Sequence, residues 1–387
     1  MTGIYVHIPF CEQKCQYCDF YSIVVSDPIE FQTVVDNYLS AIQREVHYYK
    51  DQMGDSVFQT IFIGGGTPTL LPPNQLGDLI QFLRTSFPFA PDLEITVEAN
   101  PNTLTIEMIR ALYEAGVNRI SLGAQVFQDR LLAKLGRTHS VEDIADSVEM
   151  VQACGIENFN LDLIYGLPGQ SLTDWEETLL QAVHLQPTHL SCYSLIVEEG
   201  TPFFELQKQG LLHEADNDLQ AQMYDKTRRI LADSGYVHYE ISNFCRPQYE
   251  AVHNLLYWRN RPFLGLGSGA TGYLNRIRYT NIPNIRKYIE GWSRGRPQYL
   301  NWEKVSLDEE MDETMMVGMR LLTGVNEKGF RDRFGRGLME VYEKEIQELL
   351  KRDLVQFKDG FLRVTEQGLY LENLVSGAFL RDLDSPS

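Results

Sequence analysis

The sequence has no apolar run that approaches the roughly 20 residues needed to span a membrane as a helix. Residues 1–7 show no basic stretch followed by an apolar one, so we expect no signal peptide. Six cysteines among 387 residues are too few for a disulfide scaffold. We therefore expect a cytoplasmic protein, in a compartment where thiols stay reduced.

Basic residues are also scarce, because 34 Lys and Arg stand against 53 Asp and Glu, giving a formal net charge of −19. A surface of this charge repels phosphate backbones and anionic lipid, so we expect neither nucleic acid nor membrane as a partner. The chain is 43% hydrophobic and 11% aromatic, a composition that can bury a large core. A length of 387 residues is enough for two domains.

Apolar, β-rich runs alternate with amphipathic helical patterns over the first two hundred residues. We expect strands at residues 4–8, 60–63, 94–98, 119–122, 158–164 and 189–195, and helices at 31–49, 76–86, 106–115, 141–154 and 172–185. Strands separated by helices of this length pair in parallel through right-handed crossovers. Six such units predict an α/β fold, a partial (β/α)6 barrel whose ligand site lies beyond the carboxyl ends of the strands.

A second region begins near residue 300. Helical patterns at 307–322 and 338–352 precede two short strands, 354–357 and 361–364, which a Lys-Asp-Gly turn joins. Helices followed by a hairpin predict a small winged-helix-like unit. We divide the chain into a core barrel at 1–235, an extension at 236–300 and a C-terminal domain at 301–387.

Three of the six cysteines, Cys11, Cys15 and Cys18, fall within eight residues directly after the first predicted strand. Thiolates are the ligands of iron–sulfur clusters, and a complete set is four cysteines. Phe20 stands where a further cysteine would follow, so a [4Fe–4S] cluster held by this loop would leave one iron open. A zinc site and a disulfide are the alternatives, but no fourth ligand follows at finger spacing and a disulfide leaves one thiol unpaired.

Glycine and polar residues then follow the next four strands in order. Residues 64–67, Gly-Gly-Gly-Thr, come directly after the second strand, and absent side chains let a backbone approach a charged ligand. Glu98 ends the third strand and Gln125 follows the fourth. Arg137 offers a paired contact to a carboxylate, and Asp162 lies in an otherwise apolar strand, where it requires a partner. Each residue alone is better explained as structural or solvated, with the exception of Asp162; together they favour one shared ligand.

The stretch Tyr-Val-His-Ile-Pro-Phe at residues 5–10, with the cysteine loop after it, closely resembles the radical SAM proteins. In that family S-adenosylmethionine (SAM) chelates the open iron, and an electron from the cluster releases a 5′-deoxyadenosyl radical. The chain is similar to the branch with oxygen-independent coproporphyrinogen III oxidase and the HemW family. The resemblance implies SAM contacts by Tyr5, Tyr17, Gly65, Gly66, Thr67, Glu98, Gln125, Arg137 and Asp162.

The segment 253–258, His-Asn-Leu-Leu-Tyr-Trp, resembles the HNxxYW motif of the HemW family, which binds heme. The resemblance implies heme contacts by His253, Asn254, Tyr257 and Trp258. Imidazole is a common axial ligand, aromatic rings stack on a flat macrocycle, and Arg259 and Arg261 can pair with propionates. From the residues alone, a structural turn with internal hydrogen bonds is the stronger interpretation, and the axial ligand stays open.

Two departures separate the chain from the oxidase. Phe20 replaces the fourth cysteine of the oxidase motif CxxxCxxCxC, and few residues precede the first strand, so we do not expect the oxidase's N-terminal cover. The resemblance therefore favours a heme chaperone that passes heme to acceptor proteins, with coproporphyrinogen III decarboxylation as the alternative. A homodimer is left open. A nucleic-acid module in the C-terminal region is least favoured, because Glu residues interleave with Lys and Arg over 340–352.

Overall fold

The computed structural model describes residues 2–54 and 56–381. The six strands of its first half pair in parallel, each with the next along the chain. They are β1 (Gly3–Ile8), β2 (Phe58–Gly65), β3 (Phe89–Ala99), β4 (Arg119–Gln125), β5 (Asn158–Tyr165) and β6 (His189–Ser194). All six predicted strands are confirmed, with ends that shift by a few residues.

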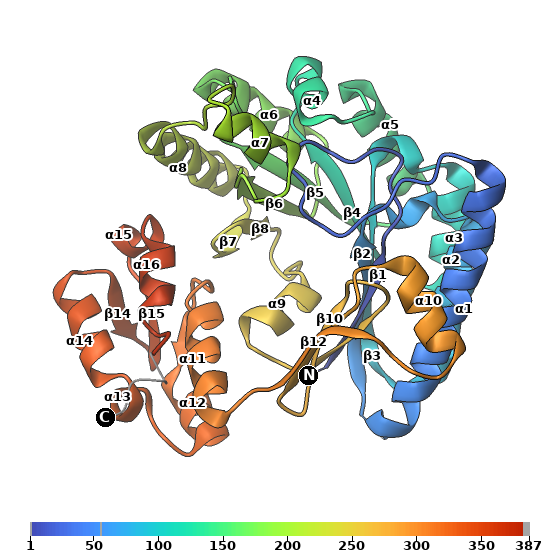
Figure 1. Ribbon diagram of the computed structural model, residues 1–387. Coiled ribbons are helices and arrows are strands. Elements are labelled where there is room, and N and C mark those ends of the chain that lie inside the picture. Colours follow the sequence, from blue (N-terminus) through green and yellow to red (C-terminus); the bar gives the residue numbers. More distant parts are fainter. Residues whose placement is uncertain (1, 55, 382–387) are drawn as a thin grey trace.

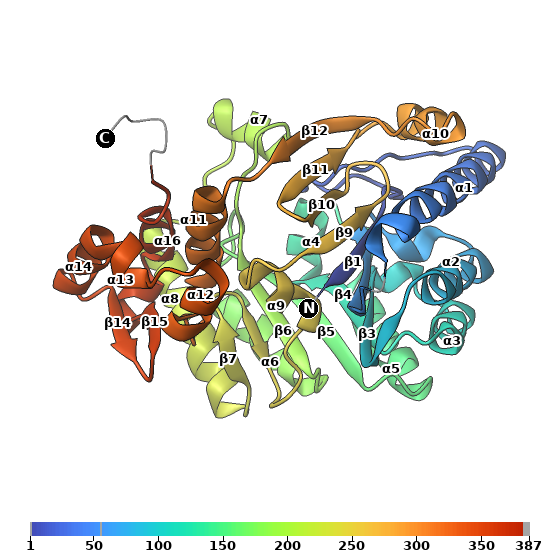
Figure 2. The ribbon, with the colours of Figure 1, turned by 90° about the horizontal axis from the view of Figure 1, so that it is seen from below.

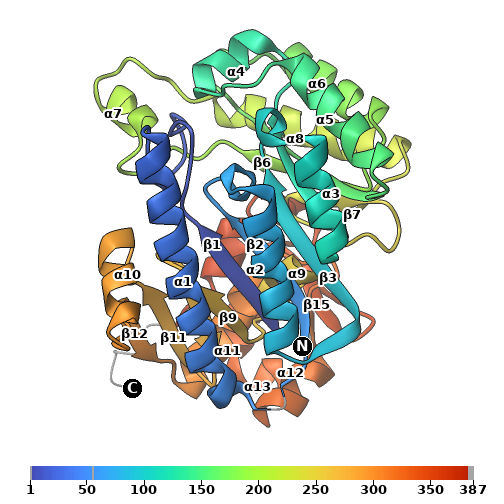
Figure 3. The same cartoon turned by 90° about the vertical axis from the view of Figure 1, so that its right-hand side faces the viewer.

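Helices between these strands cover one face of the sheet, as α1, α2 and α3 do in front of β1 to β3 in Figure 3. The helices between the strands are α1 (Pro28–Met53), α2 (Pro73–Ser86), α3 (Ile106–Ala115), α4 (Asp129–Leu135), α5 (Val141–Ala153) and α6 (Leu172–His184), and α7 (Pro202–Lys208) and α8 (Asn217–Asp233) follow β6. Thr105 caps α3 by accepting from the Met108 amide, as the sequence indicates. Of the helices described, none combines the length and apolar character that crossing a bilayer demands.

Further strands extend the sheet at both edges, and none of them was predicted. They are β7 (Val237–Glu240), β8 (Asn243–Cys245), β9 (Phe263–Leu266), β10 (Thr271–Leu274), β11 (Ile277–Asn281) and β12 (Tyr299–Lys304). Within the described residues the strand order is β12-β11-β10-β9-β1-β2-β3-β4-β5-β6-β8-β7, and the two edge strands do not pair (Figure 1). The sheet is therefore open, which confirms the partial barrel. Two helices belong to this part: α9 (Val252–Trp258) and α10 (Ile285–Ser293).

The C-terminal region combines helices with a small antiparallel sheet, in the order β13 (Val325–Asn326), β15 (Phe361–Val364) and β14 (Val355–Lys358). Its helices are α11 (Leu307–Gly318), α12 (Glu327–Phe334), α13 (Leu338–Val341), α14 (Glu343–Lys351), α15 (Glu366–Leu369) and α16 (Glu372–Gly377). The predicted hairpin is confirmed.

Two details of that region differ from the sequence prediction. The expected helix 338–352 breaks at Tyr342, whose buried hydroxyl donates to Asp312 Oδ1 at 2.7 Å. The third strand, β13, was missed because two residues carry no periodic pattern. Both features depend on contacts with distant residues. The domain boundaries at 235 and 300 stay a prediction.

Candidate functional site

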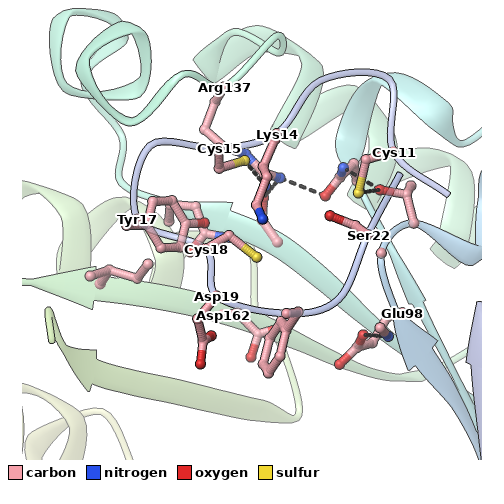
Figure 4. Close-up of a pocket in the computed structure, with 18 of the residues that line it drawn as sticks. Cys11, Lys14, Cys15, Tyr17, Cys18, Asp19, Ser22, Glu98, Arg137 and Asp162 are labelled. Carbon is pink, nitrogen blue, oxygen red and sulfur yellow. Dashed lines mark hydrogen bonds between the residues drawn. The ribbon is translucent and has the colours of Figure 1, made fainter. Parts of the chain in front are cut away.

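A cavity of about 490 Å³ lies at the carboxyl ends of β2 to β6, under the loop that carries the three cysteines. In Figure 4 the loop passes over the strand ends, with Glu98 and Asp162 on the strands below it. Eleven residues assigned from the sequence line this one cavity: Cys11, Cys15, Tyr17, Cys18, Gly65, Gly66, Thr67, Glu98, Gln125, Arg137 and Asp162. Its volume is within the usual range for a small-molecule site.

Tyr5 is the one assigned SAM residue that does not line the cavity among the described residues. Its hydroxyl lies 3.0 Å from His7 Nδ1, and its ring is stacked on Phe62. His7 Nε2 lies 2.8 Å from the carbonyl oxygen of Tyr21, beyond the cysteine loop. Tyr5 therefore reaches the site through His7 and the backbone.

Backbone hydrogen bonds join the cysteine loop to neighbouring segments of the chain. The Cys11 amide donates to the Ile23 carbonyl at 3.0 Å, and the Gln16 amide donates to the Leu135 carbonyl at 3.0 Å. All three thiols are free and partly exposed. Burial raises the pKa of Cys18 to about 11 and also raises that of Cys11, so thiolates here require a cationic partner such as bound metal.

The three thiols fit a cluster as ligands, because one loop presents them, unpaired, to one cavity. In the described part of the chain, no three His, Cys, Asp or Glu side chains gather closely enough to hold a single metal ion. Each thiolate of a four-iron cluster binds a different iron, so its ligands stand further apart than those of one ion. The donor set and its spacing suit an iron–sulfur cluster.

Glycine is required where β2 reaches the cavity. Gly65 has φ of 112°, and a Cβ there would lie 2.5 Å from the His7 ring. At Gly66 a Cβ would lie 2.5 Å from the carbonyl oxygen of Phe10. The backbone of β2 therefore borders the cavity without side chains, and the Gly65 amide donates to Glu98 Oε2 at 3.0 Å.

Two half-buried carboxylates, Glu98 and Asp162, face this part of the cavity. Burial and the neighbouring Asp162 raise the pKa of Glu98 to about 7. Burial also raises the pKa of Asp162, although hydrogen bonds from Ser121 at 2.8 Å and Asn160 at 3.0 Å act in the opposite direction. The partner that the sequence required for Asp162 is therefore this Ser–Asn pair. Both carboxylates are acceptors in a place with little water.

Arg137 and Lys14 are cationic residues that line the cavity, and Arg137 has its hydrogen-bond partners within the site. Its Nη1 lies 3.6 Å from Cys15 Sγ, and its Nη2 donates to Asn100 Oδ1 at 2.6 Å and to the Gly123 carbonyl at 2.9 Å. Asn100 in turn donates to Thr67 Oγ1 at 3.0 Å. Sequence reasoning missed Asn100, and its signal was its place two residues after Glu98 at the same strand end.

Gln125 holds a left-handed backbone, with φ of 67°, at the end of β4. Non-glycine residues in this region are strained, and such strain gathers at functional sites. The strand ladder between β4 and β5 shifts register at the same place. The position assigned from the sequence therefore coincides with a local irregularity that turns the chain at the cavity.

The segment 253–258 lies elsewhere, on α9. His253 is 1% exposed, its Nδ1 lies 2.7 Å from Thr60 Oγ1, and its Nε2 lies 2.8 Å from the Tyr257 hydroxyl. Burial lowers its pKa to about 3, so the ring is neutral. Glu94 accepts from the His253 and Val252 amides at 3.0 Å. The internal hydrogen bonds expected of a structural turn are present, and both ring nitrogens already have partners.

Neither Asn254 nor Trp258 lines the cavity described above. Asn254 is half-buried on α9. The ring of Trp258 lies 4.6 Å from the Arg320 guanidinium and borders a second, smaller cavity. The structure thus brings the cysteines and eight of the nine SAM residues together on one cavity, and none of the four heme residues lines it. His253 nevertheless reaches β2, since its ring and that of Tyr5 both stack on Phe62.

Comparison with known proteins identifies two family regions in the chain. Residues 5–182 match the Radical SAM superfamily, and residues 305–371 match the HemN C-terminal domain. The chain is similar to the heme chaperone HemW of Bacillus subtilis, at 39% identity over 99% of this chain and 100% of the relative. It is also similar to HemW of Lactococcus lactis, at 37% identity over 98% of this chain and 98% of the relative. HemW of Escherichia coli is 34% identical over 96% of this chain and 97% of the relative.

Among solved structures, the radical SAM enzyme coproporphyrinogen III oxidase (HemN) from Escherichia coli superposes with a TM-score of 0.84. The match covers 98% of this chain and 89% of that one, at 23% sequence identity. At this identity the likeness concerns the fold alone. It extends from the sheet through the C-terminal region.

Proposed function

The chain belongs to the heme chaperone HemW family of radical SAM proteins, and from this premise we propose that it binds heme and delivers it to heme-accepting proteins. Cys11, Cys15 and Cys18 would hold a [4Fe–4S] cluster, with one iron open to SAM. When bound, the cluster and SAM supply one-electron chemistry. The observation that carries the proposal is the convergence of three free thiols and eight assigned SAM residues on one cavity.

Each residue of the cavity has a role suited to a molecule with an ammonium group, a carboxylate and a ribose. Glu98 and Asp162 accept hydrogen bonds from ammonium or hydroxyl groups, and Arg137 pairs with the carboxylate. The backbone at Gly65 and Gly66 admits the charged end of the ligand. Tyr17, whose pKa burial raises, stays neutral and excludes water from the cysteine loop.

The remaining assigned SAM residues have supporting roles in this proposal. Thr67, which accepts from Asn100, fixes the turn after β2, and Gln125 borders the ligand from β4. Tyr5 acts by orienting His7 beneath the cavity.

We propose that α9 carries the heme contact, through His253, Asn254, Tyr257 and Trp258. His253 would bind iron only if it gave up its hydrogen bond to Thr60 or to Tyr257. We further propose a cytoplasmic protein with three parts, at 1–235, 236–300 and 301–387. The family supports the chaperone over the oxidase, and Phe20 lines the cavity where the oxidase motif has a cysteine.

The test is anaerobic reconstitution of the cluster, followed by separate titrations with heme and with coproporphyrinogen III. We expect heme to bind, with SAM bound at the reconstituted cluster, and coproporphyrinogen III to remain unchanged. Decarboxylation of coproporphyrinogen III with formation of 5′-deoxyadenosine would overturn the chaperone assignment in favour of the oxidase. A protein that takes up no heme would overturn it as well.

A further inference from the structure

A second cavity, of about 220 Å³, lies where the end of α9 meets the C-terminal region. Figure 2 shows α9 beside α11, and the two helices are in contact. Trp258, Phe330 and Phe334 give the cavity an aromatic wall, and Arg259, Arg261 and Arg333 also border it. No Asp or Glu lines it in the described part of the chain. Three guanidinium groups around one cavity stand out in a protein whose formal net charge is −19.

The positive charge of this cavity is only partly compensated. Arg333 pairs with Glu310 at 2.5 Å and donates to the carbonyl oxygens of Arg259 and Asn260 at 3.2 and 2.8 Å. Arg261, in contrast, is exposed and has no carboxylate within ion-pair distance among residues 2–54 and 56–381. Partial desolvation and the nearby Arg333 and Arg259 lower the pKa of Arg261. Cations held together in this way attract an anion, and a carboxylate matches the fork of a guanidinium.

A further donor at this place lacks a partner. The indole N–H of Trp258 is buried and has no acceptor among the described residues. A buried donor without an acceptor costs free energy. The Arg320 guanidinium lies over one face of the Trp258 ring, with its Cζ 4.6 Å from the ring centroid. Trp258 and Arg261 therefore place an aromatic ring and a guanidinium group on the wall of one cavity, together with the buried indole N–H, for which the described residues offer no acceptor.

We propose that the cavity bordered by Trp258, Arg261 and Arg333 binds a carboxylate, and that this carboxylate is a propionate arm of the heme assigned to α9. The inference rests on the proposed function and deepens it. A volume of about 220 Å³ is below the roughly 300–1,000 Å³ of pockets that enclose whole ligands. The cavity therefore admits an arm and leaves the macrocycle outside, against the end of α9.

The two ends of α9 differ in a way that favours this placement. At the start of the helix, His253 is 1% exposed and bonded to Thr60 and Tyr257, so an approaching ligand finds no open group. At its end, Trp258 borders a cavity, and Arg261 has no carboxylate partner in the part of the chain that the structure describes. A porphyrin carboxylate would therefore engage the segment from its Trp258 end, without first displacing His253.

The experiment titrates the reconstituted full-length protein with heme and with heme dimethyl ester, which lacks both carboxylates. We expect the unaltered protein to bind heme about tenfold to a hundredfold more tightly than the ester. Arg261→Gln should lose this preference while keeping its affinity for the ester. Arg110→Gln is the matched control, because Arg110 is exposed on α3, remote from α9.

Retained iron–sulfur absorbance would verify that Arg261→Gln is folded. Equal binding of heme and ester by the unaltered protein, or an intact preference in Arg261→Gln, would overturn the carboxylate site and leave the chaperone function standing. Failure of the unaltered protein to bind either porphyrin would overturn both. Arg261→Lys should recover part of the preference, because lysine keeps the charge but loses the fork.

Discussion

The cavity under the cysteine loop and helix α9 both hold ionisable side chains with shifted pKa values, but only the first leaves them open to a ligand. In the cavity, Glu98 and Asp162 are half-buried carboxylates whose raised pKa values mark a cost of desolvation. On α9, the His253 ring is more fully buried, and both its nitrogens have hydrogen-bond partners. Glu98 and Asp162 also accept hydrogen bonds, yet both line the cavity, whereas His253 does not. Access to a cavity, rather than the presence of a hydrogen-bond partner, separates the two regions.

The origin of this difference lies in where each segment sits. Parallel strands end at one edge, so residues that follow β2, β3, β4 and β5 share a space that no element fills. Helix α9 packs against β2, where Thr60 and Phe62 contact His253. Glu94 on β3 holds the first amides of that helix. The start of α9 is therefore part of the core.

The largest effect expected concerns the cysteine loop. Replacing Cys18 by Ser should abolish the reconstituted cluster, because two thiolates and a hydroxyl cannot hold three irons of the cube. Iron and sulfide per chain, with the visible absorbance, are the measurement. Cys154→Ser is the matched control, since Cys154 is a free thiol at the end of α5 and should leave the cluster unchanged. A full cluster in Cys18→Ser would contradict the site.

The second prediction tests the structural role of α9. His253→Ala should lower the free energy of unfolding by about 3–5 kcal/mol, because it opens a cavity and leaves the Thr60 and Tyr257 hydroxyls unpaired. Denaturant unfolding measures the change. Asn254→Ala, on the same helix and half-buried, should cost much less. Equal losses of unfolding free energy in His253→Ala and Asn254→Ala would show that the bonded His253 ring has no special structural role. Iron–sulfur absorbance in His253→Ala should persist.

The third prediction concerns the stability that the protein loses by desolvating Glu98 in the cavity under the cysteine loop. The pKa of Glu98 rises from its ordinary value of 4.5 to about 7, so folded protein binds a proton that unfolded protein has released. The stability present below pH 4.5 is then lost as pH rises through 7, by up to about 3 kcal/mol. Glu98→Gln should flatten this decline in unfolding experiments between pH 5 and 8. A decline as steep as in the unaltered protein would show that Glu98 carries no such cost.

The smallest effect is expected at Arg137. Arg137→Lys should weaken SAM binding by about tenfold, because lysine keeps the charge but loses the paired geometry. Calorimetric titration of reconstituted protein with SAM gives the affinity. Arg130→Lys serves as control, since Arg130 pairs with Asp174 outside the cavity. Equal affinities for SAM in all three proteins would place the ligand's carboxylate away from Arg137.

The elements with strong local signals could be predicted from the sequence. The strand beginning at Arg119 and the helix from Ile106 to Ala115, with Thr105 as its cap, appear at the expected residues. The order of strands and helices then implied that residues after successive strands converge, as Gly65, Glu98 and Arg137 do. Local periodicity was sufficient to predict these elements, and the rule that parallel strands end at one edge of a sheet was sufficient to predict that these residues meet.

What escaped prediction depends on partners far along the chain. Strand β9 pairs with β1 from 260 residues away in sequence, as at Gly3 and Phe263, and its four residues carry no distinctive pattern. The engagement of His253 with Thr60 spans 193 positions. The sequence favoured internal hydrogen bonds for the segment 253–258, and the bond from His253 to Tyr257 is one of them. The Thr60 partner could not be foreseen, because it depends on the packing of α9 on β2.

Whether cluster and heme occupy different regions is decided by heme titration of a variant with Cys11, Cys15 and Cys18 all replaced by Ser. We expect this variant to lack the iron–sulfur absorbance and to bind heme with the affinity of the unaltered protein. Loss of heme binding together with the three thiols would contradict this expectation, because heme would then depend on the cysteine loop rather than on α9.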